Sequence, residues 1–130
     1  MDFSSLGLSP SLQQALADQN YNQPYPIQKE VIPAILNGKD VLGIAQTGSG
    51  KTAGYVLPIL MNLRANTASK NRHVNVLVLV PTRELAMQVR EVFRLFGSAL
   101  PERIKSLAVF GGVAINPQMK ALQGVNILVA

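Results

Sequence analysis

Hydrophobic positions in the first third of the chain recur three and four residues apart, which is the spacing of amphipathic helices. They predict one helix over residues 10–18 and a second over residues 26–36. Ser9 and Pro10 form a typical helix start, with Ser as the cap and Pro in the first turn. Pro33 lies inside the second helix, where it removes one backbone donor and should bend the helix. The intervening residues are polar and rich in Asn, so we expect a loop there.

The pattern changes from Val41 onward, where short apolar runs alternate with helical periodicity. Apolar runs predict four buried strands, over residues 41–45, 74–80, 107–110 and 125–129. Helical patterns predict three helices between them, over residues 51–63, 83–96 and 117–122. The polar stretch 64–75 is expected to be a solvated connection. Strands that alternate with helices predict an α/β fold, in which helices cover both faces of a parallel sheet.

Composition excludes several classes of protein but does not identify the function. The 130 residues fit one domain or slightly less, with 48% apolar and 15% charged residues, which argues against disorder and against two full-sized domains. We expect no membrane segment and no secretory leader, and the absence of cysteine excludes disulfides, as suits a cytoplasmic protein. The net charge of +5 makes an anionic partner such as nucleic acid plausible.

The most informative segment is a glycine-rich loop between a predicted strand and a predicted helix. It reads Ala45-Gln46-Thr47-Gly48-Ser49-Gly50-Lys51-Thr52. The strict phosphate-binding pattern is G-x-x-x-x-G-K-[ST], which this loop follows except that Ala45 stands in the first glycine place. We therefore predict a phosphate-binding loop (P-loop) here.

The chemistry of phosphate binding explains this spacing. Gly48 and Gly50 allow a tight turn, so that successive N–H groups can face one anion. The N-terminus of the following helix adds unpaired N–H groups and a positive dipole end. Lys51 can place its ammonium near the terminal phosphates, and the Thr52 hydroxyl can ligate Mg²⁺ together with phosphate oxygens.

Four elements in this order resemble the motifs of the DEAD-box RNA helicases. The P-loop from Ala45 to Thr52 resembles motif I of that family, which characteristically begins with Ala. Pro24-Tyr25-Pro26-Ile27-Gln28 resembles its Q motif, Pro81-Thr82-Arg83-Glu84-Leu85-Ala86 matches motif Ia, and Gly111-Gly112 matches the GG element. Because these elements span nearly the whole chain, it is identified as a member of the family.

The resemblance implies a fold and a place within it. We expect the first part of a RecA-like P-loop NTPase domain, truncated before its sheet is complete, with a Q-motif helical segment over residues 1–38 and a partial ATP-binding domain over residues 39–130. The segments 3–10 and 110–118 resemble the bacterial RhlE-type branch. We also expect marginal stability or self-association through the open sheet edge.

The Q motif implies recognition of adenine and hence of ATP over GTP. A glutamine amide can accept a hydrogen bond from the exocyclic amine of adenine and donate one to the adjacent ring nitrogen. Gln28 is the expected selector, Tyr21 the expected stacking platform, and Phe3 is expected to pack behind Tyr21. Two residues depart from the family pattern: Asn20 stands where Gly is usual, and Tyr25 where Thr is usual.

Motif Ia and the GG element imply contacts with the RNA backbone. Pro81, Thr82 and Arg83 follow a predicted strand, and the carboxyl ends of parallel strands are where α/β sheets place their ligands. Gly111 and Gly112 end the next predicted strand and would let a second phosphate approach closely. Contacts with the backbone read no bases, so binding should tolerate sequence and depend on salt.

Hydrolysis of ATP requires groups that these residues do not include. Phosphoryl transfer needs a carboxylate that holds Mg²⁺ and a group that orients water, yet the chain has no Asp after Asp40 and no acidic residue after Glu102. We therefore expect the parent protein to be an ATP-dependent RNA helicase, and this chain to bind ATP, ADP or AMP without turnover. An unrelated P-loop ATPase or kinase is the alternative. Tyr55, Arg90 and Arg94 are interpreted as packing and surface residues.

Overall fold

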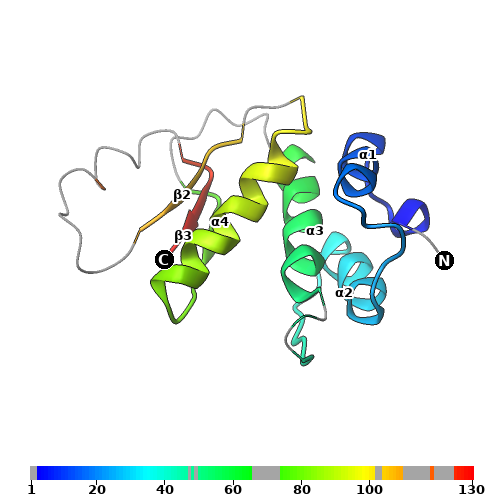
Figure 1. Ribbon diagram of the computed structural model, residues 1–130, viewed down its shortest axis with the longest axis horizontal. Coiled ribbons are helices and arrows are strands. Elements are labelled where there is room, and N and C mark those ends of the chain that lie inside the picture. The colour runs from blue at the N-terminus through cyan, green and yellow to red at the C-terminus, as the bar shows by residue number, and fades with distance from the viewer. Residues whose placement is uncertain are drawn as a thin grey trace. The chain divides into compact units, whose positions relative to one another are not determined.

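The computed structural model describes residues 3–46, 48, 50–65, 74–101, 104–109, 118 and 125–130. Its chain divides into two compact units, Met1–Asn66 and Thr67–Ala130 (Figure 1). The first unit is helical and contains the Q motif and the P-loop, whereas the second carries the sheet and motif Ia. No described helix has the length and apolar character that crossing a bilayer would require.

The first unit has one short 3₁₀ helix and three α-helices, and its predicted helices are confirmed. They are η1 (Phe3–Leu6), α1 (Pro10–Asp18), α2 (Pro26–Leu36) and α3 (Lys51–Ala65). Fully or almost fully buried side chains from the three α-helices form its core: Leu12, Leu16, Ile32, Val56, Leu57 and Leu60. Helices α2 and α3 pack against each other, which fixes the Q motif on α2 close to the start of α3.

Caps and side chains satisfy the helix ends of this unit. Ser9 caps α1, with its hydroxyl accepting from the backbone N–H of Leu12 at 3.4 Å, as the Ser-Pro start predicts. The side-chain amide of Asn62 on α3 donates to the carbonyl of Ile35 at 3.2 Å. Because the last carbonyls of a helix have no partner within it, this bond both satisfies the end of α2 and ties α3 to it.

The predicted strand at residues 41–45 is wrong for this structure. Residues 41–46 form no strand, and the side chains of Leu42 and Ile44 are 87% and 85% exposed. A strand exists only through hydrogen bonds to a neighbour, and the described sheet consists entirely of residues from the second unit. The run therefore has the apolar sequence typical of a strand but forms no pairing with a neighbouring strand. The expected self-association stays a prediction.

The second unit contains a parallel three-stranded sheet with one helix on it. Its strands are β1 (Val76–Val78), β2 (Ser106–Ala108) and β3 (Ile127–Val129), in the order β1-β3-β2, and its helix is α4 (Arg83–Gly97). In Figure 1, α4 runs alongside β2 and β3, and these elements are in contact. Parallel strands and an alternating order of elements confirm the predicted α/β class.

One face of this sheet is covered by α4. Ile127 and Val129 of the central strand are fully buried, and the apolar stripe of α4 contributes Ala86, Val89, Phe93 and Phe96, each about 1% exposed. Side chains alternate along a strand, so Leu128 and its register partner Leu77 belong to the opposite face, where Leu77 is 59% exposed. Leu85 and Val92 of the same helix are only half-buried.

Each strand is shorter than the apolar run that predicts it, although pairing continues beyond the strand ends. Val80 donates to the carbonyl of Ala130 at 2.9 Å, and Val109 donates to that of Val129 at 2.8 Å. The carboxyl ends of β1 and β2 therefore reach the same edge of the sheet. The predicted helix at 117–122, apart from Gln118, most of the 64–75 connection and the Gly111-Gly112 pair lie outside the described residues.

Candidate nucleotide-binding site

The loop before α3 turns through two glycines in the left-handed conformation. Gly48 and Gly50 have φ values of +82° and +83°, a left-handed conformation that side chains rarely adopt. Gly50 directly precedes Lys51, the first residue of α3, and its carbonyl accepts the first helical bond from Gly54 at 3.1 Å. The amides of the first turn therefore have no partner within the helix and are placed to meet an anion. Thr47 and Ser49 lie outside the described residues.

Gln28 joins the Q motif to this loop through both ends of its side-chain amide. Its Nε2 donates to the carbonyl of Gly50 at 3.0 Å, and its Oε1 accepts from the backbone N–H of Tyr25 at 2.9 Å. The side chain is completely buried, and it runs past the first turn of α3, where a Cβ added at Gly54 would lie 3.7 Å from its Cγ. Interpreted from sequence alone, Gln28 could have been an exposed residue of a helix start, and its burial excludes that interpretation.

Tyr25 also packs on the loop, which the sequence did not indicate. A Cβ built on Gly50 would lie 2.4 Å from Nε2 of Gln28 and 2.6 Å from Cδ2 of Tyr25, so these two side chains occupy the space that any larger residue would need. Tyr25 is 48% exposed, so its ring contacts Gly50 while much of the residue remains in contact with solvent. The one signal for this role in the sequence was the departure from the Thr usual at this place in the motif.

Lys51 makes an internal contact across the loop. Its ammonium Nζ donates to the carbonyl of Ala45 at 2.5 Å, which spans the loop from its last residues to its first. The side chain is exposed, so a phosphate can reach the ammonium without disturbing the core. A bound phosphate would have to compete with this carbonyl for the Lys51 donors.

Thr52 occupies the second position of α3 and is half-buried. Its side chain hydrogen-bonds with Tyr55, one turn further along the helix. Burial raises the pKa of the Tyr55 phenol above its ordinary value, while the bond with Thr52 acts in the opposite direction. Tyr55 therefore packs beside the Thr52 hydroxyl, in agreement with its interpretation as a packing residue.

The two aromatic residues expected at the purine lie in different environments. Phe3 belongs to η1 and is only 5% exposed, with Leu6 and Leu8 equally buried. Tyr21 is half-buried, and its backbone N–H donates to the carbonyl of Leu16 at 2.8 Å. A purine could reach the ring of Phe3 only after the side chains that cover it move, whereas Tyr21 retains accessible surface. Gln46 is exposed.

Motif Ia forms the start of α4 in the second unit. Thr82 caps the helix, with its hydroxyl accepting from the backbone N–H of Leu85 at 3.1 Å. A threonine hydroxyl retains its own proton as a donor while it accepts, so Thr82 can cap the helix and still bind an anion. Pro81, Thr82 and Arg83 are all exposed, and they follow β1 at its carboxyl end.

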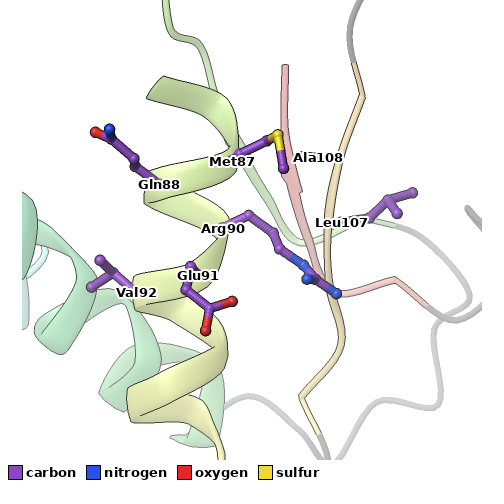
Figure 2. Close-up of a pocket in the computed structure, with 7 residues that line it drawn as sticks. All are labelled: Met87, Gln88, Arg90, Glu91, Val92, Leu107 and Ala108. Atoms are coloured by element: carbon purple, nitrogen blue, oxygen red, sulfur yellow. The ribbon is translucent and has the colours of Figure 1, made fainter. Parts of the chain in front are cut away.

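A groove of about 780 Å³ lies between α4 and β2 in the same unit. Figure 2 shows Arg90 extending from α4 toward the strands, where its Nε donates to the carbonyl of Ser106 at 3.3 Å. Arg94 is paired instead with Glu91 on the exposed side of the helix, and their hydrogen bond lowers the pKa of that carboxyl group. The Arg94 pair agrees with a solvated helix face, whereas Arg90 has a structural role that the sequence did not predict.

The family comparison agrees with this arrangement of motifs. The profile described as "DEAD/DEAH box helicase" matches residues 25–130, which include Tyr25 to Gln28 of the Q motif, the P-loop and motif Ia. The chain belongs to the DEAD/DEAH box helicase family. The alternative of an unrelated P-loop ATPase or kinase is thereby removed.

Relatives of this DEAD-box chain are bacterial and eukaryotic helicases. The ATP-dependent RNA helicase DeaD of Escherichia coli (strain K12) is 46% identical over 128 residues, and DeaD of Buchnera aphidicola (subsp. Baizongia pistaciae) is 48% identical over 123 residues. These alignments cover 98% and 95% of the chain but 20% of each relative, so the chain spans about a fifth of their length. These bacterial relatives carry the name DeaD, and they do not support the expected RhlE-type branch.

Solved structures of DEAD-box proteins have the same fold. A DEAD box protein from the hyperthermophile Methanococcus jannaschii matches 99% of the chain, and 34% of its own, with a TM-score of 0.88 and 35% identity. The RNA helicase Prp28 from Chaetomium thermophilum, solved bound to ADP, matches 98% of the chain and 31% of its own, with a TM-score of 0.80 and 31% identity. The fold is therefore that of part of a DEAD-box RecA-like domain.

Proposed function

We propose that this chain binds adenine nucleotide through its Q motif and P-loop, as the nucleotide-binding part of an ATP-dependent RNA helicase. The observation that carries the proposal is the bond from Nε2 of Gln28 to the carbonyl of Gly50. It puts the residue expected to select adenine in direct contact with the loop expected to bind phosphate. The description of the chain's relatives as ATP-dependent RNA helicases supports the same function.

Recognition of adenine requires Gln28 to exchange its partners. Its Oε1 and Nε2 are bonded to Tyr25 and Gly50, and adenine offers an amine donor and a ring-nitrogen acceptor that could replace them. Guanine presents a carbonyl oxygen at the position of that amine and would leave one amide bond unmade. Because an unmade bond at a buried polar group is costly, a buried Gln28 is well suited to reject guanine. Tyr21 would stack on the purine, and Phe3 would support it.

Phosphate and Mg²⁺ would bind at the start of α3. The described residues contain no group of three or more His, Cys, Asp or Glu that could hold a metal ion, so Mg²⁺ would depend on the Thr52 hydroxyl together with phosphate oxygens of the nucleotide. Lys51 and the first-turn amides would hold the terminal phosphates, with Ala45, Gln46, Thr47, Gly48, Ser49 and Gly50 as the surrounding loop. Since the 130 residues include no Asp-Glu-Ala-Asp run, we propose that the chain alone binds ATP without hydrolysing it.

Replacing Gln28 with alanine should reduce the preference for ATP over GTP. If the one amide bond that guanine leaves unmade is worth about 1–2 kcal/mol, the ratio of the two affinities falls by about 5- to 30-fold. The ratio is measured by titrating both nucleotides into the same preparation, so the unfolded fraction cancels. Gln23→Ala, which removes an exposed glutamine of the same unit, should leave the ratio unchanged. A Gln28→Ala chain with the wild-type ratio would contradict the assignment of Gln28.

We also propose that motif Ia, with Gly111 and Gly112, binds the RNA backbone. The support lies in the exposed helix start, where Thr82 retains a donor and Arg83 adds positive charge. For single-stranded RNA, Arg83→Ala should reduce the slope of log affinity against log salt concentration by about 0.7, the loss of one phosphate contact. Arg94→Ala is the matched control, since it removes the same charge from the last turn of the same helix, away from motif Ia. Equal slopes for Arg83→Ala and wild type would count against this assignment.

A further inference from the structure

Gly50 is held from the side of α2 by two contacts that differ in kind. One is the hydrogen bond from Nε2 of Gln28 to the Gly50 carbonyl, at 3.0 Å. The other is the ring of Tyr25, whose Cδ2 would lie only 2.6 Å from a Cβ at Gly50. The first is polar and can be exchanged for a ligand, whereas the second is a van der Waals contact that needs no hydrogen-bond partner.

The position of Tyr25 does not depend on the Gln28 side chain alone. Its backbone N–H donates to Oε1 of Gln28, but its carbonyl accepts from the backbone N–H groups of Gln28 and Lys29 at 3.0 and 3.2 Å. Tyr25 is the residue that caps α2, and Pro26 begins the helix with a fixed φ. The helix start therefore still positions the Tyr25 backbone when the Gln28 amide turns toward another partner.

We propose that Tyr25 is a positioning residue that packs its ring on Gly50 and keeps the P-loop ordered while Gln28 is engaged elsewhere. The inference rests on the proposed function in one respect, since adenine is the partner that would take the Gln28 amide. When adenine holds the Gln28 amide, the Tyr25 ring is the contact that still joins the Q motif to Gly50. A chain without the ring would lose that contact as well. Binding of the phosphates would then include the cost of ordering the loop.

The expected effect on phosphate binding does not depend on the base. Tyr25→Thr removes the ring yet keeps a residue type that caps helices well, so α2 retains its start. We expect its affinity for ADP and for GDP to fall by the same factor, about fivefold, the size of one lost ring contact. Tyr25→Phe keeps the ring and should bind both nucleotides as the wild type does.

A second measurement needs no nucleotide. Hydrogen exchange of the Gly54 backbone amide, which donates to the Gly50 carbonyl, should be about fivefold faster in the Gln28→Ala/Tyr25→Thr double variant than in Gln28→Ala alone, because Gln28→Ala already removes the other contact with Gly50. Amides of α1, such as that of Leu16, report any general loss of stability and should exchange at the same rate in both chains.

The outcomes separate this inference from the proposed function. If Tyr25→Thr lost affinity for ADP but not for GDP, Tyr25 would contact the base. If its affinity for both nucleotides were unchanged, the ring would have no effect on binding. Either result overturns the proposal. If the wild-type chain binds no nucleotide, the proposed function fails. The hydrogen-exchange rates alone then test whether Tyr25 orders the loop. Equal exchange of the Gly54 amide in Gln28→Ala and in the Gln28→Ala/Tyr25→Thr double variant would then overturn the role of Tyr25.

Discussion

Replacing Lys51 with alanine is expected to weaken ATP binding by about 10- to 100-fold, which corresponds to the roughly 1.5–3 kcal/mol of a charge-assisted hydrogen bond. The Lys51 side chain is exposed, and its ammonium, bonded to the carbonyl of Ala45, has further donors with which to meet the terminal phosphates. The variant also loses the internal bond to the Ala45 carbonyl, so the measured difference includes its effect on the loop. Isothermal titration of both chains with ATP measures the difference.

The control for Lys51→Ala is another lysine of the same unit. Lys39→Ala removes an identical exposed charge three residues after the end of α2, away from the loop sequence, and should bind ATP with near wild-type affinity. Comparison of the two variants separates direct phosphate contact from a general change in net charge, which acts over longer distances and is screened by salt. Equal losses in both variants, or no loss in Lys51→Ala, would contradict the P-loop assignment.

Replacing Gly50 with alanine is expected to lower the free energy of unfolding by about 2–4 kcal/mol. The left-handed φ of +83° costs roughly 1–2 kcal/mol in a residue with a Cβ. The added methyl group would also meet Nε2 of Gln28 and the Tyr25 ring at distances that no real Cβ tolerates, so the buried amide must give up a hydrogen bond or the loop must shift, at about 1–2 kcal/mol more. Urea denaturation followed by far-UV circular dichroism measures the change.

Gly48 provides a matched control for Gly50. Its φ of +82° is nearly the same, but a Cβ built on it would have no atom within 4 Å. Gly48→Ala should therefore lose only the roughly 1–2 kcal/mol of backbone strain. The difference between the two variants measures the packing of the Q motif on the loop. If the two variants were equally stable, the contact of Gln28 and Tyr25 with Gly50 would not exist in solution.

Local rules were sufficient to predict the four α-helices α1 to α4, but not the short 3₁₀ helix η1. Ser9 and Pro10 mark the start of α1, and the apolar spacing of α4 predicts the face that Val89 and Phe93 bury against the sheet. Each of these signals lies within a few residues of the element it describes. Local rules predicted a strand over residues 41–45, and none is formed there. A strand depends on a partner that its own sequence does not specify.

The site was predictable in part for a similar reason. The motifs indicated Gln28, Gly50 and Lys51 as candidates, since the chemistry of nucleotide binding calls for these residue types at a fixed spacing. The contacts among them were not predictable, because Gln28 and Gly50 are 22 residues apart and meet only through the packing of α2 on α3. Tyr25 was interpreted as a departure from the motif, and its contact with Gly50 needs the same packing.

The key groups of the proposed site are bonded to one another. Lys51 is bonded to Ala45, and Gln28 is bonded to Gly50. Nucleotide would replace both bonds, one through its phosphates and one through its base. Because Gln28 contacts the loop directly, binding of the base and binding of the phosphates should change each other's affinity by the same factor.

The most direct test of a single nucleotide site is the effect of ADP with Mg²⁺ on the amide NMR spectrum of the ¹⁵N-labelled wild-type chain. We expect the side-chain amide of Gln28 and the backbone amides of Gly48, Gly50, Lys51 and Thr52 to shift together, with one common binding constant. GDP should move the loop amides less at equal concentration. A folded chain whose Gln28 and loop amides do not respond to saturating ADP would contradict the central claim that they form one nucleotide site.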